Sequence, residues 1–195
     1  MKAGGREMQM AGVLKGKTIA ILATDGFEEA EVAEPKKALQ HAGAKVHVVA
    51  PHAGEIKGWK LTDWGRNATV DKELNEVSFD DYDALMLPGG LMNPDKLRTD
   101  IRAVQFVKKF FDAGKPVAAI CHAPWTLIEA DVVRGRTLTS WPSLQTDLRN
   151  AGANWVDEEV VVDGNLTTSR KPEDLPAFNK MMIEQFAGTQ HLANA

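Results

Sequence analysis

The chain contains one cysteine, Cys121, and the next residue is a histidine, His122. An apolar run over 117–120 precedes this pair and a helical pattern follows it, which predicts that Cys121 lies at a sharp strand-to-helix turn. The positive end of the helix would favour the thiolate and lower the pKa of the thiol, so the position indicates a nucleophile. The alternative is structural: cysteine is often a small buried side chain, and a histidine often makes a single backbone hydrogen bond.

Two carboxylates, Glu28 and Glu31, follow the first predicted strand. Because they are three residues apart, they share one face of the predicted helix. An acid beside a cysteine in a pocket of low polarity would keep its proton and donate a hydrogen bond to the thiolate. The alternative is that acidic side chains in a first helical turn only complement the helix dipole.

A glycine pair, Gly89 and Gly90, ends the third predicted strand. One hypothesis is an oxyanion hole in which the N–H groups of Gly90 and His122 face a developing negative oxygen. The other is a tight turn with no catalytic role. Neither of the glycine-rich phosphate-binding patterns is present. Asp95 follows this turn at the same end of the predicted sheet as Cys121, where an aspartate can cap the next helix.

The elements that must position these residues alternate along the chain. Strands are predicted over 17–23, 45–50, 84–87 and 117–120, hairpins over 51–70 and 160–168, and helices over 28–42, 101–113, 123–130, 172–186 and from a cap at Ser143 to Gly152. This alternation predicts an α/β protein with a mostly parallel central sheet and right-handed crossovers. Sites in such sheets lie beyond the carboxyl ends of the strands, where the three motifs would meet.

Composition indicates one globular domain. The 195 residues are 44% hydrophobic and 26% charged, and we expect a domain over 17–188 between a loose tail at 1–16 and a C-terminal tail at 189–195. The net charge of -4 gives no reason to expect a nucleic-acid partner, and no apolar run is long enough to span a membrane. A single cysteine excludes an internal disulfide and favours the reducing cytoplasm. We expect no metal and no cofactor.

Four segments together resemble a known family. They are Asp25 to Glu31 (DGFEEAE), Leu87 to Gly90 (LPGG), Gly114 to His122 (GKPVAAICH) and Thr139 to Pro142 (TSWP). The chain is similar over 17–188 to the PfpI family, which includes intracellular protease I enzymes and general stress proteins within the Parkinsonism-associated deglycase superfamily.

The resemblance implies a flavodoxin-like three-layer fold, akin to class I glutamine amidotransferases, that assembles into homodimers or hexamers. It implies that Cys121 is the nucleophile, His122 its partner and Glu31 the acid that hydrogen-bonds the sulfur, with Glu28 and Gly89 in support. It further implies that Asp95 reaches the histidine of a neighbouring subunit. Two positions depart from the family pattern: Asp95 replaces a longer glutamate, and Ala123 replaces a glycine in Cys-His-Gly-Pro.

Two classes of function follow. In the first, the protein is a cysteine-dependent hydrolase acting on peptides or on glyoxal-adducted carbonyl substrates, with Cys121 attacking a carbonyl and His122 moving the proton. In the second, it is a redox-sensing or chaperone-like stress protein whose Cys121 is oxidised with little turnover.

Overall fold

The computed structural model describes residues 12–188 of the chain. The strands, in chain order, are β1 (Thr18–Leu22), β2 (Phe27–Glu28), β3 (Lys45–Ala50), β4 (Glu55–Lys60), β5 (Asp63–Thr69), β6 (Lys72–Glu73), β7 (Ala84–Leu87), β8 (Val117–Ile120), β9 (Thr137–Leu138), β10 (Asn154–Trp155), β11 (Val160–Asp163) and β12 (Leu166–Ser169). The helices are α2 (Glu29–His41), α3 (Met92–Leu97), α4 (Ile101–Asp112), α5 (Pro124–Glu129), α6 (Gln145–Asn150) and α7 (Leu175–Phe186). Short 3-10 turns are η1 (Leu74–Glu76), η2 (Phe79–Asp81), η3 (Pro142–Leu144) and η4 (Pro172–Asp174).

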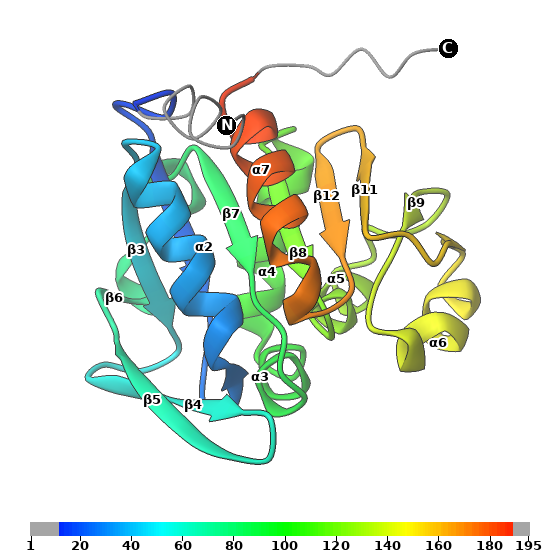
Figure 1. Cartoon of the computed structure of the whole chain (residues 1–195), viewed down its shortest axis with the longest axis horizontal. Helices are drawn as coiled ribbons and strands as arrows, with labels where there is room; N and C mark the ends of the chain where they lie inside the picture. The colour runs from blue at the N-terminus through cyan, green and yellow to red at the C-terminus, as the bar shows by residue number, and fades with distance from the viewer. Residues whose placement is uncertain (1–11, 189–195) are drawn as a thin grey trace, which may run out of the picture.

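A seven-stranded sheet in the order β11-β12-β8-β7-β1-β3-β6 forms the centre of the molecule. Every pairing in it is parallel except the β11–β12 hairpin, which confirms the α/β class and the mostly parallel sheet. Helices α2 and α7 lie side by side on one face, and α4 lies on the other, so the fold has three layers (Figure 1). The strands β1, β7 and β8 are consecutive neighbours, and their carboxyl ends therefore bring the three predicted motifs to one edge.

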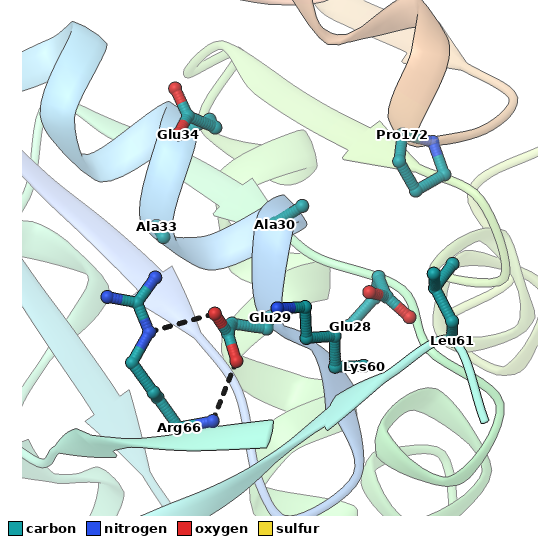
Figure 2. Close-up of a pocket in the computed structure, with 9 residues that line it drawn as sticks. All are labelled: Glu28, Glu29, Ala30, Ala33, Glu34, Lys60, Leu61, Arg66 and Pro172. Atoms are coloured by element: carbon teal, nitrogen blue, oxygen red, sulfur yellow. Dashed lines mark hydrogen bonds and ion pairs between the residues drawn. The ribbon is translucent and has the colours of Figure 1, made fainter. Parts of the chain in front are cut away.

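A small second sheet, in the order β2-β4-β5, flanks that edge. The predicted hairpin excursion is its β4–β5 pair. The carboxylate of Glu29, in the first turn of α2, accepts hydrogen bonds from the backbone N–H of Arg66 at 2.7 Å and from its Nε at 2.9 Å (Figure 2). This bidentate contact joins the hairpin to the start of the helix that carries Glu31.

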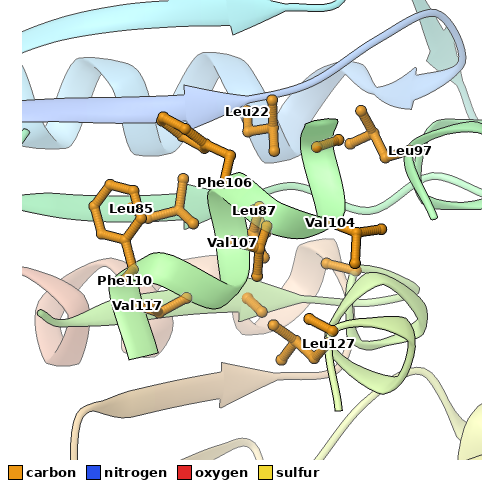
Figure 3. Close-up of a cluster of buried hydrophobic side chains, with 14 of the residues drawn as sticks. Leu22, Leu85, Leu87, Leu97, Val104, Phe106, Val107, Phe110, Val117 and Leu127 are labelled. Atoms are coloured by element: carbon orange, nitrogen blue, oxygen red, sulfur yellow. The ribbon is translucent and has the colours of Figure 1, made fainter. Parts of the chain in front are cut away.

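The central sheet separates two hydrophobic cores. On the α4 face, leucine and valine side chains from β1, β7 and β8 pack against the valine and phenylalanine side chains of α4 (Figure 3). On the other face, the sheet packs against α2 and α7, and Cys121 belongs to this second core. The strands between the two layers are apolar on both faces, as the continuous apolar runs in the sequence predicted.

One predicted helix start is wrong. Ser143 does not cap a helix but lies inside η3, whose N-terminal flanking residue is Trp141. Pro142 occupies the first position of this turn, where its fixed φ and missing N–H favour helix initiation without a side-chain cap.

Part of the segment predicted to be a loose N-terminal tail is packed on the domain instead. Residues 12–16 pack on the domain: Leu14 is fully buried, and its N–H donates to the Ala42 carbonyl at 2.7 Å. Residues 1–11 and the predicted C-terminal tail at 189–195 lie outside the described residues. Within 12–188, no helix combines the length and the apolar character needed to cross a membrane.

Replacing Leu14 with alanine should destabilise the domain, because Leu14 is buried in the α2–α7 core. We expect a loss of about 2–4 kcal/mol in the free energy of unfolding, measured by urea denaturation. The matched control is Val13→Ala, since the neighbouring Val13 is 42% exposed and should cost less than about 0.5 kcal/mol. Equal effects at the two positions would contradict the packing of this segment.

Candidate active site

Cys121 lies between β8 and α5 with a φ of +63°. This left-handed conformation is unfavourable for a residue with a side chain and persists only where the surrounding structure imposes it. Here the Cys121 N–H donates to the Ser169 carbonyl at 3.1 Å, and the Cys121 carbonyl accepts from the Trp141 N–H at 2.9 Å. The sharp strand-to-helix turn predicted from the sequence is therefore present and is fixed on both sides.

The glycine pair after β7 permits a close approach that no other residue type would allow. A Cβ atom on Gly89 would lie 2.6 Å from the Cβ of Cys121 and 2.7 Å from Oε2 of Glu31. Gly90 has a φ of +78°, and its backbone lies directly against that of Gly26. The N–H groups of Gly90 and His122 are both directed at the Cys121 sulfur, so the two donors of the oxyanion-hole hypothesis lie at the predicted nucleophile.

Glu31 is completely buried in the first turn of α2. Its Oε2 accepts a hydrogen bond from the Gly89 N–H at 2.8 Å, whereas its buried Oε1 has no hydrogen-bond partner within residues 12–188. Burial raises the pKa of Glu31 to about 8, and this effect exceeds the opposing contributions of the Gly89 and Cys121 hydrogen bonds. Glu31 therefore keeps its proton at neutral pH, as the sequence predicted for an acid beside the cysteine.

Glu28, the second predicted carboxylate, precedes α2 at the end of β2. Burial raises the pKa of Glu28, and the N–H of Leu61 at the tip of the β4–β5 hairpin opposes that rise through a hydrogen bond. The charge of Glu28 in turn contributes to the raised pKa of Glu31.

The thiol departs from the expectation of a lowered pKa. Burial raises the pKa of Cys121 well above its ordinary value, and the charge of Glu31 is the second-largest cause of this rise. Hydrogen bonds from the Gly90 and His122 N–H groups lower the pKa but do not offset the rise. The helix that follows has only six residues, so its dipole contributes little. Since Glu31 is protonated at neutral pH, its charge disappears there, and its O–H becomes available as a donor to the sulfur.

His122 lies beside the sulfur, with its Nδ1 at 3.1 Å from Sγ of Cys121. Its ring is stacked on Trp141, with centroids 5.6 Å apart, and inclined to Trp125 at 5.3 Å. Burial lowers the pKa of His122 to about 4. The imidazole is therefore neutral at pH 7 and can accept a proton from the thiol.

Asp95 does not join this cluster within one chain. It lies on α3, where its side chain is 61% exposed and forms an ion pair with Arg98 at 3.4 Å. The alternative that Asp95 caps the helix is wrong, because Leu91 occupies the capping position and no side chain caps this end.

Asn93 is a positioning residue that sequence reasoning missed. It is fully buried, its Oδ1 accepts from the Thr24 N–H at 2.7 Å, and its Nδ2 donates to the carbonyls of Pro88 at 2.8 Å and Gly89 at 3.1 Å. It thereby joins the ends of β1 and β7. The signal that could have found it is an asparagine followed by proline after a glycine pair, a common turn pattern.

A pocket of about 260 Å³ lies beside this site, between the first turn of α2 and the hairpin tip. Figure 2 shows Leu61 and Pro172 near one another with Glu28 close by, and Lys60 beside Glu29. The pocket therefore presents both charged and apolar groups to a ligand. Across residues 12–188, no group of three or more His, Cys, Asp or Glu side chains is arranged to hold a metal ion.

Comparisons with known proteins show which family the chain resembles over most of its length. Residues 17–185 match the model of the DJ-1/PfpI family. Protein/nucleic acid deglycase 2 of Escherichia coli (strain K12) is 48% identical over 166 residues, covering 84% of this chain and 94% of that protein. General stress protein 18 of Bacillus subtilis (strain 168) is 46% identical over 167 residues, covering 85% of this chain and 95% of that protein. The crystal structure of Drosophila melanogaster DJ-1beta superposes with a TM-score of 0.80 at 33% identity, covering 88% of this chain and 91% of that one.

Glu31→Gln should change how stability depends on pH. With a pKa raised from 4.5 to about 8, folded Glu31 holds a proton that the unfolded chain releases, so wild-type stability falls as pH rises through this window. Glutamine does not titrate, and the variant should gain about 1.4 kcal/mol relative to wild type per pH unit between about pH 5 and 8. Urea denaturation across this range measures the gain. The exposed Glu34→Gln variant should show no such trend, and a constant difference for Glu31→Gln would contradict a protonated Glu31.

Proposed function

Because the chain belongs to the DJ-1/PfpI family, we propose that it is a cysteine-dependent hydrolase that removes glyoxal-type adducts from proteins or peptides. The observation that carries the proposal is the Cys121 sulfur, which lies 3.1 Å from a neutral imidazole and faces the N–H groups of Gly90 and His122. Relatives named as deglycases support the choice of substrate class.

The first step is addition to a carbonyl. Nδ1 of His122 takes the proton of the Cys121 thiol while Sγ forms a bond to the carbonyl carbon, and the C=O electron pair moves onto oxygen. The N–H groups of Gly90 and His122 stabilise this oxyanion. In a glyoxal-type adduct, the amine is bonded to the carbinol carbon next to this carbonyl. The amine takes the proton from the imidazolium and leaves as the carbinol O–H becomes a carbonyl and passes its proton to the oxyanion. The C–S bond then breaks, the hydroxyl proton returns to sulfur through His122, and water hydrates the released dicarbonyl.

The environment of His122 favours adducts over ordinary peptides. Hydrolysis of a peptide needs an imidazolium that holds a proton until a poor leaving group departs. A histidine whose pKa is lowered to about 4, with no carboxylate bonded to it within residues 12–188, forms that imidazolium at a high cost. Addition of a thiol to the activated carbonyl of a glyoxal-type adduct does not need an imidazolium that persists until a poor leaving group departs. This site therefore suits glyoxal-type adducts better than ordinary peptides.

Wild-type protein should remove preformed methylglyoxal adducts from a peptide and should cleave casein far more slowly. The peptide is freed of unreacted methylglyoxal beforehand, so that adduct loss cannot reflect scavenging of free aldehyde, and mass spectrometry follows the adduct. Cys121→Ser should abolish adduct loss because it removes the nucleophile.

Comparable turnover by Cys121→Ser would exclude the mechanism, and efficient casein cleavage would favour a peptidase. Absence of turnover, together with oxidation of Cys121 by mild peroxide before any methionine, would favour the redox alternative.

We also propose that the protein assembles into a homodimer or hexamer in which Asp95 reaches His122 of a second copy. The exposed Asp95 side chain supports this arrangement, because its Arg98 ion pair lies at the surface and is easily exchanged. An acid near His122 would stabilise the imidazolium that the buried histidine otherwise resists.

Asp95→Asn should lower turnover without changing assembly, because asparagine is close in size but carries no charge. Co-refolding Asp95→Asn with Cys121→Ser should restore part of the activity, since mixed assemblies contain sites with both an intact sulfur and an intact acid. Sedimentation measures the assembly and adduct loss the activity. A fully active monomer would rule out the shared site.

A further inference from the structure

His122 raises a question of orientation. A catalytic histidine is usually fixed by a third group, most often a carboxylate, that binds its second ring nitrogen. Within residues 12–188, no carboxylate forms a hydrogen bond or an ion pair with His122, yet its Nδ1 lies 3.1 Å from the sulfur. Any restraint on rotation of the ring that one chain supplies must therefore come from groups other than a carboxylate.

Trp141 contacts one side of the imidazole. The two rings are nearly parallel, at 23°, with centroids 5.6 Å apart. The backbone of Trp141 is joined to the turn that carries the nucleophile, because the Trp141 backbone N–H donates to the Cys121 carbonyl. The Trp141 carbonyl accepts from the hydroxyl of Ser140, which in turn accepts from Nε1 of Trp155 at 2.9 Å.

Trp125 makes the second ring contact, inclined at 57° with centroids 5.3 Å apart. Its Nε1 donates to the carboxylate of Asp147 at 2.9 Å, and the guanidinium of Arg98 lies 5.2 Å from its ring centre. Arg98 is also the ion-pair partner of Asp95. The Trp125 indole is thus held by contacts outside the histidine, and Trp141 is anchored through its backbone, so each ring belongs to a residue whose position is set independently of the imidazole.

We propose that Trp125 and Trp141 form an aromatic clamp that positions His122 with Nδ1 toward the sulfur, in the place that a carboxylate takes in a catalytic triad. The inference rests on the proposed function and deepens it. Two indoles orient the ring without adding a negative charge, so the imidazole stays neutral, and burial alone lowers the pKa of His122. The clamp acts within one chain, whether or not a second copy supplies an acid.

The clamp gives Asp95 an indirect connection to the site. Asp95 pairs with Arg98, and Arg98 lies over Trp125, which contacts His122. Because the Asp95 side chain is exposed, this connection is weak, and the tryptophans carry the positioning role.

The test compares phenylalanine and leucine at both positions. Phenylalanine keeps a ring surface, and Trp141→Phe and Trp125→Phe should retain turnover within about threefold, whereas each leucine variant should lose roughly tenfold or more in kcat with little change in KM. A second readout is NMR titration of the His122 ring in Cys121→Ser protein. The pKa of His122 should rise in the leucine variants, because the imidazole gains water, and should stay low in the phenylalanine variants.

The exposed Trp64 on the hairpin provides a matched control, and Trp64→Leu should change neither kcat nor the His122 titration. Circular dichroism checks that each variant folds. If one leucine variant unfolds, the leucine variant at the other tryptophan is sufficient to test the clamp. Leucine variants with wild-type kcat and an unchanged His122 pKa would overturn the clamp while leaving the proposed function intact. Turnover that survives Cys121→Ser would instead overturn the proposed function. The NMR titration of His122 would then be the measurement that tests the clamp.

Discussion

The hydrogen bond from the Gly89 N–H to the buried carboxyl of Glu31, 2.8 Å long, is the contact on which the rest of the site depends. It joins the first turn of α2 to the end of β7, and it brings Glu31 against Cys121. It requires glycine, because a Cβ at position 89 would lie 2.6 Å from the Cβ of Cys121 and 2.7 Å from Oε2 of Glu31, well inside van der Waals contact. Asn93 supports the same junction by holding the carbonyls of Pro88 and Gly89.

The site that results is built from neutral groups. Burial keeps the proton on Glu31 and keeps it off His122, so the sulfur faces an acid and a base that carry no charge at pH 7. Charge that develops on sulfur or on a substrate oxygen is therefore met by backbone N–H dipoles and by an O–H. In surroundings of low polarity, such fixed dipoles interact more strongly than they would in water.

The fold explains why these groups keep their positions relative to one another. Three neighbouring parallel strands end at one edge, two separate cores hold the sheet from both faces, and Glu29 ties the hairpin beside the pocket to α2 through Arg66. Cys121 remains in a left-handed conformation because backbone hydrogen bonds to Ser169 and Trp141 hold both sides of the turn. Leu61 and Asp131 are also non-glycine residues with positive φ, but they lie away from the Cys121 turn in the chain.

Local patterns in the sequence determined the order of strands and helices, the parallel sheet, the elbow at Cys121 and the glycine pair, because periodicity and turn chemistry act between near neighbours. They also indicated that Glu31 would stay protonated. They did not predict the burial of Leu14, the role of Asn93, the start of the helix near Ser143 or the raised pKa of Cys121. Those features were decided by the tertiary structure, since burial and desolvation depend on segments far apart in the chain. The two tryptophans beside His122 belong to the same class: they follow different strands, and only folding brings their rings to one imidazole.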